Sequence, residues 1–373
     1  MLECDREQVL AYRVAAQGLH RDEPDAAKLA VFDLGVQDSP RDTALLALAA
    51  RLDADVTEES LVDDQRFVLA WTHRGAPHFH RREELPEVIA ALVPLEEPDA
   101  MARMGWQRKQ VEAAGMAATD VLFTAARAMR KAVGKTMTKG TASTAVTKLV
   151  PESFSYWCRG CQATHILEQL MRLAAVHGGV QLEAGISPAT LSPIKGRPAI
   201  KTKPDVKAAT AVVANYLRVH GPATKSDAAG FVGTTRACVE KMWPDGLAEV
   251  RVEGKAAFLP EQRISELENP PEPDLVRLLP PLDPFLQARD KALLVPDQAY
   301  RKEVWKVLGN PGVVLADGEI AATWRSKANG RKRLDITISP FETFTPSARK
   351  LAEAETERLA TSRGFADLRV TWA

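Results

Sequence analysis

The sequence has few cysteines, no long hydrophobic run and no excess charge of either sign. Its 373 residues include four cysteines, too few for the disulfide framework of small secreted domains. No uninterrupted apolar stretch approaches the roughly 20 residues that a membrane-spanning helix needs. The first residues carry charges where a secretory signal has its apolar segment, so we expect a cytoplasmic protein.

The composition and length indicate a folded protein with several domains. With 45% hydrophobic and 26% charged residues, the chain is typical of soluble globular proteins and unlike disordered ones. A chain of 373 residues is too long for one ordinary hydrophobic core. We therefore expect two or more domains.

The net charge of zero is a cancellation between segments. Residues 1–102 carry 10 Lys and Arg against 21 Asp and Glu, a net charge of −11, whereas residues 103–204 carry 15 against 5, a net charge of +10. The blocks 205–300 and 301–373 have net charges of −3 and +4. Charge asymmetry of this kind is typical of proteins with an anionic partner, but it also fits two blocks that face each other. Both interpretations stay open.

The first hundred residues show the element order of a winged helix. Apolar residues at spacings of three and four predict helices within 4–18 and 41–52, with Pro40 at the first position of the second helix. Residues 67–82 predict a strand, a tight turn and a second strand. Two helices followed by a β-hairpin is the winged-helix order.

The same order recurs more clearly between residues 208 and 260. A helix leads to a turn at Gly221-Pro222, then to helices expected over 225–231 and 234–242. Two alternating strands around Glu253-Gly254 follow and resemble a wing. This segment matches the helix-turn-helix plan in which the second helix docks into a DNA groove.

The remaining segments predict a mainly α fold with small β-hairpins, an α+β class. Residues 105–187 are expected to be mostly helical, and the proline-rich segments 188–205 and 269–284 to be connectors. Antiparallel strands with a turn at Asn329-Gly330 and a final amphipathic helix follow. We expect tandem winged-helix units and a C-terminal β-rich subdomain with boundaries at 1–102, 103–204, 205–268 and 269–373.

Two groups of basic residues are candidates for DNA contact. The first is expected along one helix face, beside the hydroxyl-rich TKGTAST stretch: Arg127, Arg130, Lys131, Lys135 and Lys139. The second surrounds the tip of the C-terminal hairpin: Arg325, Lys327, Arg331, Lys332 and Arg333. The alternatives are a solvated helix face and edge charges that discourage aggregation.

Cys158, Cys161 and His165 form the pattern C-x2-C-x3-H, which supplies up to three zinc ligands. On a helix these residues fall at i, i+3 and i+7, which is also the spacing of a buried stripe. The only neighbour suited to be a fourth ligand is His177. Cysteines among apolar residues are more often packed in a core, so we expect no metal and no cofactor, and leave zinc as the alternative.

The order of motifs resembles the bacterial winged-helix DNA glycosylases, the family of the azinomycin-resistance and interstrand-crosslink glycosylases. GVQDSPRDTALLALAARL, RGAPH, the winged-helix segment, and LLPPLDPFLQARDKALLVP followed by GVVLADGEIAATWR carry the resemblance. Its most specific part runs from Leu278 to Trp324. The resemblance implies a monofunctional enzyme that removes alkylated or crosslinked purines from double-stranded DNA. A single chain with tandem winged helices is expected to act as a monomer.

The family's functional residues lie in a short motif of Gln, any residue, and Gln or Asp. Gln37 matches the first position, but Ser39 takes the third and Asp38 the middle one. Hydrolysis of an N-glycosidic bond needs an oriented water and stabilisation of a positively charged sugar, which an amide and a carboxylate supply. We expect Gln37, Asp38 and Ser39 to form the catalytic site. The alternative is that Asp38 or Ser39 caps the following helix.

The RGAPH hairpin is expected to contact the DNA through Arg74 and His78, whereas His73 and His80 are expected to be exposed strand or turn residues. Because the motif departs from the family pattern, a second hypothesis stays open. In this hypothesis the chain is a winged-helix protein that binds DNA without hydrolysing it.

Overall fold

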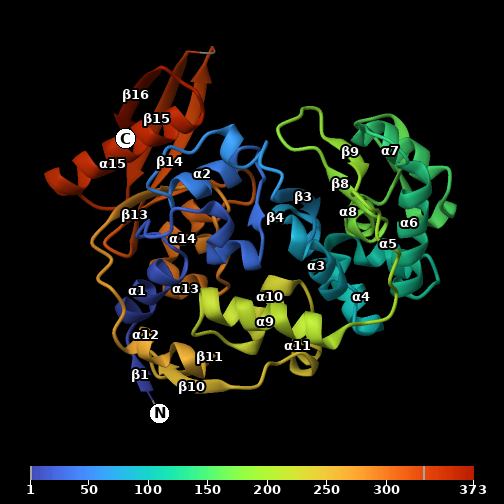
Figure 1. Cartoon of the computed structure of the whole chain (residues 1–373), viewed down its shortest axis with the longest axis horizontal. Helices are drawn as coiled ribbons and strands as arrows, with labels where there is room; N and C mark the ends of the chain where they lie inside the picture. Colours follow the sequence, from blue (N-terminus) through green and yellow to red (C-terminus); the bar gives the residue numbers. More distant parts are fainter. Residues whose placement is uncertain (1, 331) are drawn as a thin grey trace. The chain divides into compact units, whose positions relative to one another are not determined.

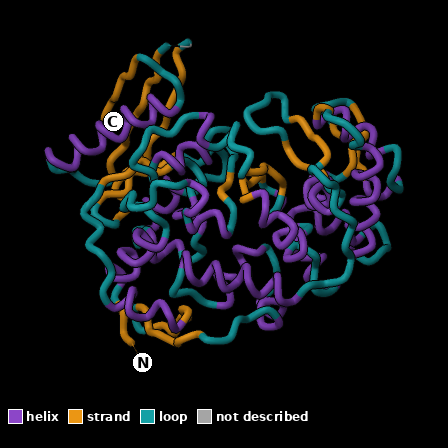
Figure 2. The backbone as a smooth tube through the Cα atoms, in the orientation of Figure 1, coloured by secondary structure: helices purple, strands orange, loops and turns teal. Residues whose placement is uncertain are grey.

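A computed structural model of the chain describes residues 2–330 and 332–373 (Figure 1). The chain divides into two compact units. Unit 1 holds residues 1–64, 215–227 and 245–373, and unit 2 holds residues 65–214 and 228–244. Figure 2 shows that helices and strands are mixed in the fold. The expected α+β class is confirmed at this level, although the strands form larger sheets than the small hairpins that we predicted.

Unit 1 is built from two sheets and the helices around them. Its helices are α1 (Arg6–Ala16), α2 (Thr43–Ala49), α12 (Ile264–Glu268), α13 (Lys291–Leu294), α14 (Gln298–Val304) and α15 (Pro346–Ser362). Its strands are β1 (Leu2–Cys4), β2 (Val36–Gln37), β10 (Leu247–Val252), β11 (Lys255–Pro260), β12 (Val276–Leu279), β13 (Gly312–Ala316), β14 (Glu319–Asn329), β15 (Arg333–Pro340) and β16 (Asp367–Trp372). One sheet has the order β1-β10-β11, and the other has the order β12-β13-β14-β15-β16.

The five-stranded sheet is the core of the C-terminal region. Alternate residues of β14, including Ile320, Ala322 and Trp324, are buried, as the period of two along a strand requires. The buried residues of β15 pack under α15 through Ala352 and Leu359. The expected hairpin and terminal helix are therefore present, and β16, which pairs in parallel with β15, is an addition that we did not predict.

Gly312 allows the sheet to close around Trp324. A Cβ atom at position 312 would lie 2.2 Å from the Trp324 ring and 2.6 Å from the Leu279 carbonyl oxygen. The Trp324 indole N–H donates to this carbonyl at 3.0 Å. Only glycine leaves room for this arrangement, which joins β12, β13 and β14 within the stretch that carries the family resemblance.

A fully buried ion pair fixes α2 in unit 1. Arg51 and Asp283 have side chains that are 0% exposed, and their bidentate contact has N–O distances of 2.7 and 2.9 Å. Arg51 also donates to the backbone carbonyls of Gln17 and Ala47. Because the charges satisfy each other and the surrounding carbonyls, this pair holds the helix that follows the Gln37 segment in a defined place.

Unit 2 combines a sheet with a cluster of helices. Its helices are α3 (Leu85–Ala91), α4 (Glu97–Arg103), α5 (Arg108–Glu112), α6 (Ala118–Ala132), α7 (Lys139–Thr147), α8 (Glu168–His177) and α11 (Arg236–Lys241). Its strands are β3 (Phe67–Trp71), β4 (Pro77–Arg81), β5 (Met137–Thr138), β6 (Ser155–Cys158), β7 (Ala163–Ile166), β8 (Val180–Leu182) and β9 (Thr190–Pro193). In the main sheet the order within the unit is β4-β3-β8-β9-β5, and β6 and β7 form a separate hairpin.

Two helices pass from one unit to the other. These are α9 (Val206–His220) and α10 (Lys225–Val232), and α11 follows with Thr235 accepting a hydrogen bond from the Cys238 N–H as its N-cap. The strands β10 and β11 pair around Glu253 and Gly254. The helices and strands that we expected between 208 and 260 are thus present, and their assignment to a winged helix stays a prediction, as do the four domain boundaries.

Several expectations on local structure were wrong. Pro40 does not begin a helix, because α2 starts at Thr43. The block 105–187 contains β5, β6, β7 and β8 besides its helices. Both proline-rich segments include a strand of a sheet, β9 in 188–205 and β12 in 269–284. Pro193 is the last residue of β9 and the other prolines lie outside both strands, so none interrupts a strand interior. None of the helices in the described residues combines the length and apolar character needed to cross a membrane.

Candidate active site and nucleic-acid interface

Gln37 is the last residue of β2, and Asp38 and Ser39 lie in the loop between β2 and α2 in unit 1. Thr43 organises this loop, because its hydroxyl accepts the Ser39 N–H at 2.9 Å and lies 2.8 Å from the Pro40 carbonyl and 3.2 Å from the Gln37 carbonyl. Asp42, which precedes α2, has a positive φ of 72°. The backbone of the motif is therefore held by one buried side chain rather than by regular secondary structure.

Asp38 points back to the first turn of α2. Its Oδ1 accepts the Ala44 N–H at 3.1 Å, so the capping role considered for this residue is realised. The pKa of Asp38 is raised to about 6, chiefly by burial and also by the nearby Asp42, while the hydrogen bond from Ala44 opposes the shift. A carboxylate that titrates close to neutral pH is suited to accept a proton from water.

The side chains of Gln37 and Ser39 are half-buried. Within the part of the chain that the structure describes, no hydrogen bond engages the Gln37 amide. The Ser39 contact that we find uses its backbone N–H. The amide of Gln37 is therefore available to a water or a substrate.

A cavity of about 280 Å³ lies beside the motif loop, within unit 1. Residues 40–43 form one wall of it. Gly312 and Trp324 of the five-stranded sheet form part of the opposite wall, together with Pro281. The cavity is thus lined by three of the segments that carry the family resemblance.

Polar groups line the same cavity. The Asn310 side-chain oxygen is buried and has no hydrogen-bond partner among the described residues, so it is a ready acceptor. Arg325 donates to the Gly309 carbonyl at 2.7 Å, and Arg363 donates to the Ser326 hydroxyl at 3.0 Å. These arginines place positive charge at the cavity.

The charged hairpin tip is exposed. Arg325, Lys327, Lys332 and Arg333 are exposed on the arms of the β14–β15 hairpin, and Arg333 pairs with Asp335 at 2.9 Å. Arg331, which we also expected there, lies outside the described residues. The tip therefore presents several cations that can reach a phosphate backbone.

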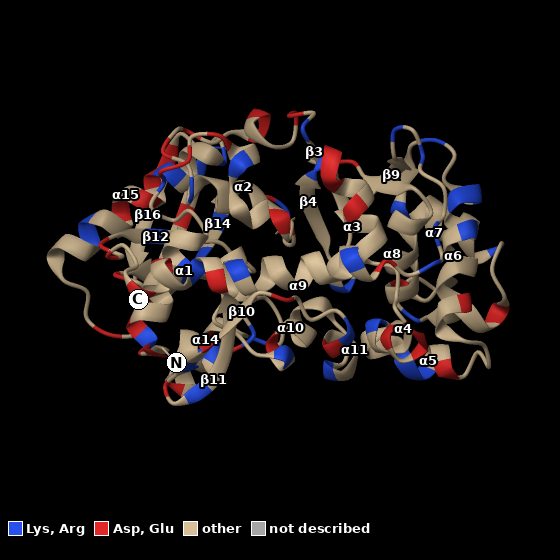
Figure 3. Cartoon of the chain, turned by 60° about the horizontal axis from the view of Figure 1, so that its bottom comes forward, with Lys and Arg blue, Asp and Glu red and all other residues tan. Residues whose placement is uncertain are grey.

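We predicted that the basic residues of unit 2 share one helix face, and this prediction was wrong. Arg127, Arg130 and Lys131 belong to α6, which ends at Ala132, whereas Lys135 lies in the following loop and Lys139 begins α7. Figure 3 colours the Lys and Arg positions along the chain blue. Arg130 donates to the carbonyls of Arg197 and Pro198, and Lys139 pairs with Glu168 at 2.6 Å. Arg127, Lys131 and Lys135 are exposed, so three of the five remain suited to contact DNA.

The expectation of exposed histidines around the hairpin was wrong. His73, His78 and His80 are at most 3% exposed, and the Thr72 hydroxyl lies 3.0 Å from His78 Nδ1 and 2.9 Å from His80 Nε2. Burial lowers the pKa of all three. A neutral His78 that is buried inside the unit cannot contact a DNA phosphate, so we exclude it from the proposed interface.

Arg74 is also engaged within unit 2. It has a left-handed backbone with φ 57°, its guanidinium donates to the Phe231 carbonyl, and it stacks over the Phe231 ring at 5.0 Å. Its predicted contact with DNA is not supported by this arrangement.

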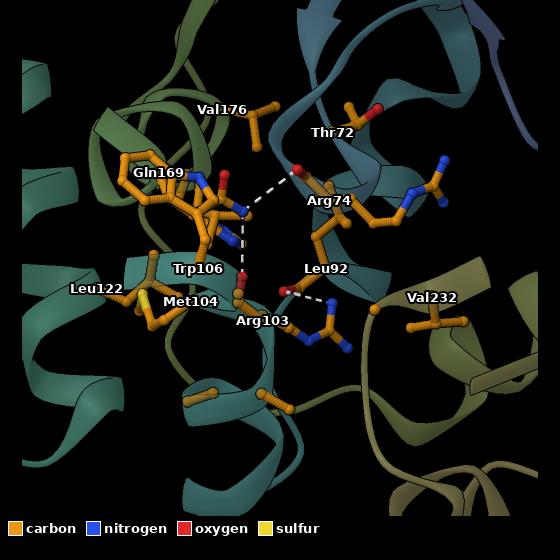
Figure 4. Close-up of a pocket in the computed structure, with 16 residues that line it drawn as sticks. Thr72, Arg74, Leu92, Arg103, Met104, Trp106, Leu122, Gln169, Val176 and Val232 are labelled. Atoms are coloured by element: carbon orange, nitrogen blue, oxygen red, sulfur yellow. Dashed lines mark hydrogen bonds between the residues drawn. The ribbon is translucent and has the colours of Figure 1, made fainter. Parts of the chain in front are cut away.

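A second cavity, of about 240 Å³, lies in unit 2 (Figure 4). Trp106, Leu122 and Val176 give it an apolar lining, and the Gln169 amide spans it by donating to the carbonyls of Arg74 and Arg103 at 3.2 and 3.1 Å. The Gln169 amide is therefore already paired, whereas Nδ1 of His177, which also lines the cavity, is buried and has no hydrogen-bond partner among the described residues.

Cys158, Cys161 and His165 do not lie on a helix. They belong to the β6–β7 hairpin, and one ligand atom from each lies within 4.8 Å of the others. The suggested fourth ligand, His177, is buried in α8 against Phe123 and is not part of this cluster. The helical reading of the three residues was therefore wrong, although the cluster is real.

Comparison with known proteins places the chain in a family. The family model described as "DNA glycosylase AlkZ-like" matches residues 31–362. The chain belongs to the AlkZ-like DNA glycosylase family. The match includes the Gln37 motif, the buried hairpin and the five-stranded sheet as far as α15.

Individual relatives agree with this membership. The Interstrand DNA cross-link repair glycosylase of Streptomyces sahachiroi is 28% identical over 179 residues, which are 45% of this chain and 46% of that protein. The chain thus aligns with about half the length of this curated relative. The solved structure of Streptomyces sahachiroi DNA glycosylase AlkZ superposes with a TM-score of 0.76 over 100% of both chains at 22% identity, which shows a shared fold.

Sequence reasoning missed several residues of this AlkZ-like site. Thr43 and Ala44 hold the motif loop and the Asp38 carboxylate, yet they read as ordinary first residues of an apolar helix. Asn310 and Arg363 line the cavity from distant segments. The N-P-G sequence at 310–312 signals a turn, but nothing in it indicates that the turn faces the motif.

Proposed function

We propose that the chain is a monofunctional DNA glycosylase that hydrolyses the N-glycosidic bond of alkylated or crosslinked purines in double-stranded DNA. The observation that carries the proposal is the combination of an amide, a carboxylate and a nearby cavity at the Gln37 motif. The Gln37 amide has no hydrogen-bond partner among the described residues, and the pKa of the adjacent Asp38 is about 6. Residues 40–43, which follow them, line a cavity that Arg325 and Arg363 also line. Family membership supplies the reaction class.

In this proposal Asp38 accepts a proton from the attacking water, and its negative charge stabilises the oxocarbenium-like sugar. Gln37 orients the same water through its side-chain amide. Alkylated purines are already good leaving groups, so the site needs no strong general acid. Ser39 is a secondary contact, since its backbone is tied to Thr43.

Positive charge on two surfaces supports DNA binding. One is the hairpin tip with Arg325, Lys327, Lys332 and Arg333, and the other consists of Arg127, Lys131 and Lys135 in unit 2. Such contacts position a duplex without reading its sequence. We propose damaged double-stranded DNA as the partner, a monomeric enzyme and a cytoplasmic location.

The test is release of free base from a duplex that carries N7-methylguanine or a crosslinked purine. Wild-type protein is compared with Gln37→Ala and Gln37→Glu, and DNA affinity is measured for each. Base release by the wild type and its loss in Gln37→Ala at unchanged DNA affinity support the proposal. No release above the protein-free rate overturns it.

A second candidate function is DNA binding without hydrolysis. The observation that favours it is Ser39, which occupies the position of Gln or Asp in the motif. Because the Asp38 carboxylate accepts the Ala44 N–H in the first turn of α2, a purely structural role as a helix cap also accounts for this contact. Salt-dependent DNA binding with no base release from any lesion would select this function.

A further inference from the structure

The β6–β7 hairpin of unit 2 places two thiols and an imidazole together. We propose that Cys158, Cys161 and His165 bind a zinc ion. Their ligand atoms lie within 4.8 Å of one another. Two ligands of a tetrahedral zinc ion at about 2.3 Å lie about 3.8 Å apart, so the ligand atoms have to approach one another by about 1 Å at most to close around the ion.

The register of the hairpin explains how the ligands converge. Cys158 pairs with Ala163, and Tyr156 pairs with His165, so Cys158 and His165 lie diagonally on one face. Cys161 lies in the turn between the strands, where Gln162 has a φ of 50°.

His165 is prepared for a ligand role. Its Nδ1 lies 3.4 Å from the Ser143 hydroxyl on α7, whereas its Nε2 is buried and has no hydrogen-bond partner among the described residues. If Nδ1 carries the proton and donates to Ser143, the Nε2 lone pair is left for a metal. A hydrogen bond on the second ring nitrogen is the usual way in which a zinc-binding histidine is oriented.

The outer half of the β6–β7 hairpin has no fully buried side chains that would hold its two strands together. Its strands have four residues each, and Phe154 and Ile166 are buried at the base, but Tyr156, Trp157, Arg159 and Cys161 are exposed. An isolated two-stranded hairpin is marginally stable in water. An ion held between the end of β6, the turn and β7 closes the exposed half.

Thiolate and imidazole ligands favour zinc among the common divalent ions. No further Cys, His, Asp or Glu joins the cluster within residues 2–330 and 332–373. The fourth position of a tetrahedral ion therefore falls to water or another small ligand. This inference is independent of the proposed glycosylase activity, because it concerns a hairpin of unit 2 and not the motif loop.

The direct test is the zinc content of full-length protein purified without a polyhistidine tag and without chelators. We expect about one zinc ion per chain in the wild type and in Cys238→Ser, the matched control for loss of a thiol. Cys158→Ser and His165→Gln are expected to lose the ion. Wild-type protein with far less than one zinc ion per chain, or with a Cys158–Cys161 disulfide in its intact mass, overturns the proposal.

A second measurement does not depend on the folding of the variants. Arg159 lies in the exposed turn, so trypsin cleavage after it reports on the closure of the hairpin. In the wild type, we expect a zinc chelator to speed cleavage at Arg159 at least tenfold, and added zinc to reverse this. In Cys158→Ser the chelator should change nothing. Equal cleavage rates of the wild type with and without chelator contradict a zinc-closed hairpin, whether or not the protein releases bases.

Discussion

Replacing Asp38 by asparagine separates a catalytic carboxylate from a helix cap. The asparagine side-chain oxygen still accepts the Ala44 N–H, so the cap is kept while the charge is removed. Burial raises the pKa of Asp38 from 3.8 to about 6. The ionised carboxylate is therefore less stable in the folded protein than in the unfolded chain.

The size of this cost follows from the shift. At pH 7.5 a shift of about two pKa units lowers the free energy of unfolding by about 3 kcal/mol. Because the pKa of Asp38 is higher in the folded protein, the loss in free energy of unfolding is complete above pH 6. It disappears as the pH falls from 6 towards 4. Asp38→Asn should thus be more stable than the wild type at pH 7.5 by up to about 3 kcal/mol, and the two should converge near pH 4.

Activity is expected to change in the opposite direction. Loss of a general base typically lowers the rate by about 10²- to 10⁴-fold, so base release by Asp38→Asn should fall in this range. The wild-type rate should rise about tenfold per pH unit below pH 6 and level off above it, and the variant should lack this dependence.

The assays are urea unfolding at pH 7.5 and pH 4 and single-turnover base release between pH 5 and 8. Asp42→Asn is the matched control, since Asp42 lies in the same loop and asparagine tolerates its positive φ. If Asp38→Asn is less stable than the wild type at pH 7.5 and releases bases at the wild-type rate, the carboxylate is only a cap and this reasoning is refuted.

Three further predictions concern stability and DNA binding. Burial lowers the pKa of four histidines in unit 2, to about 3 for His80 and about 4 for His177, so the stability that they contribute as neutral groups is present above pH 6.5 and is lost below it. Urea unfolding should show a loss of about 1.4 kcal/mol per histidine per pH unit below pH 6, and a flat profile between pH 7 and 5 would refute this. Arg51→Ala should lower the free energy of unfolding by about 3–5 kcal/mol, because it leaves the Asp283 carboxylate buried and unpaired, whereas a loss below 1 kcal/mol would show that the pair is not buried in solution. Changing Lys327 and Lys332 to glutamine should make DNA affinity less steeply dependent on salt, by a slope of about one to two in a plot of log affinity against log salt, and an unchanged slope would remove the hairpin tip from the interface.

The parts of the fold that the sequence predicted well have a strong period. In β15 apolar and polar residues alternate, in β14 Ile320, Ala322 and Trp324 are buried at a period of two, and the turn at Asn329-Gly330 lies between the strands. The hairpin of β3 and β4 was predicted from its strand, turn and strand composition. For β14 and β15 the alternation of the sequence reflects the one buried face directly.

The elements that were misplaced lack such a period. Ser155–Cys158 and Ala163–Ile166 are four-residue strands of mixed polarity, and the spacing of their Cys and His residues fits a helix as well as a hairpin. The strand β12 is surrounded by prolines, which hid it in a segment that reads as a connector. In both places, pairing with a neighbouring strand determines the structure, and the local sequence does not indicate which strand that is.

The candidate site residues stay a prediction from the sequence, and their chemistry could not be predicted from it. Gln37, Asp38 and Ser39 follow from the motif order, whereas the raised pKa of Asp38 depends on burial that only the folded loop provides. The expectation of exposed histidines was wrong for a similar reason. His78 and His80 lie in the buried centre of β4 and His73 is buried in the turn before it, and no apolar pattern in the sequence reveals this burial.

The central claim is tested most directly by base release from a duplex with a single N7-methylguanine or a purine crosslink, with wild type and Gln37→Ala compared at equal DNA occupancy. The proposed mechanism predicts that the wild type releases the damaged base and leaves an abasic site without cutting the strand. It also predicts that Gln37→Ala binds the same DNA with a rate of release at least 100-fold lower. Wild-type protein that binds the duplex but releases no base above the protein-free rate would contradict the claim.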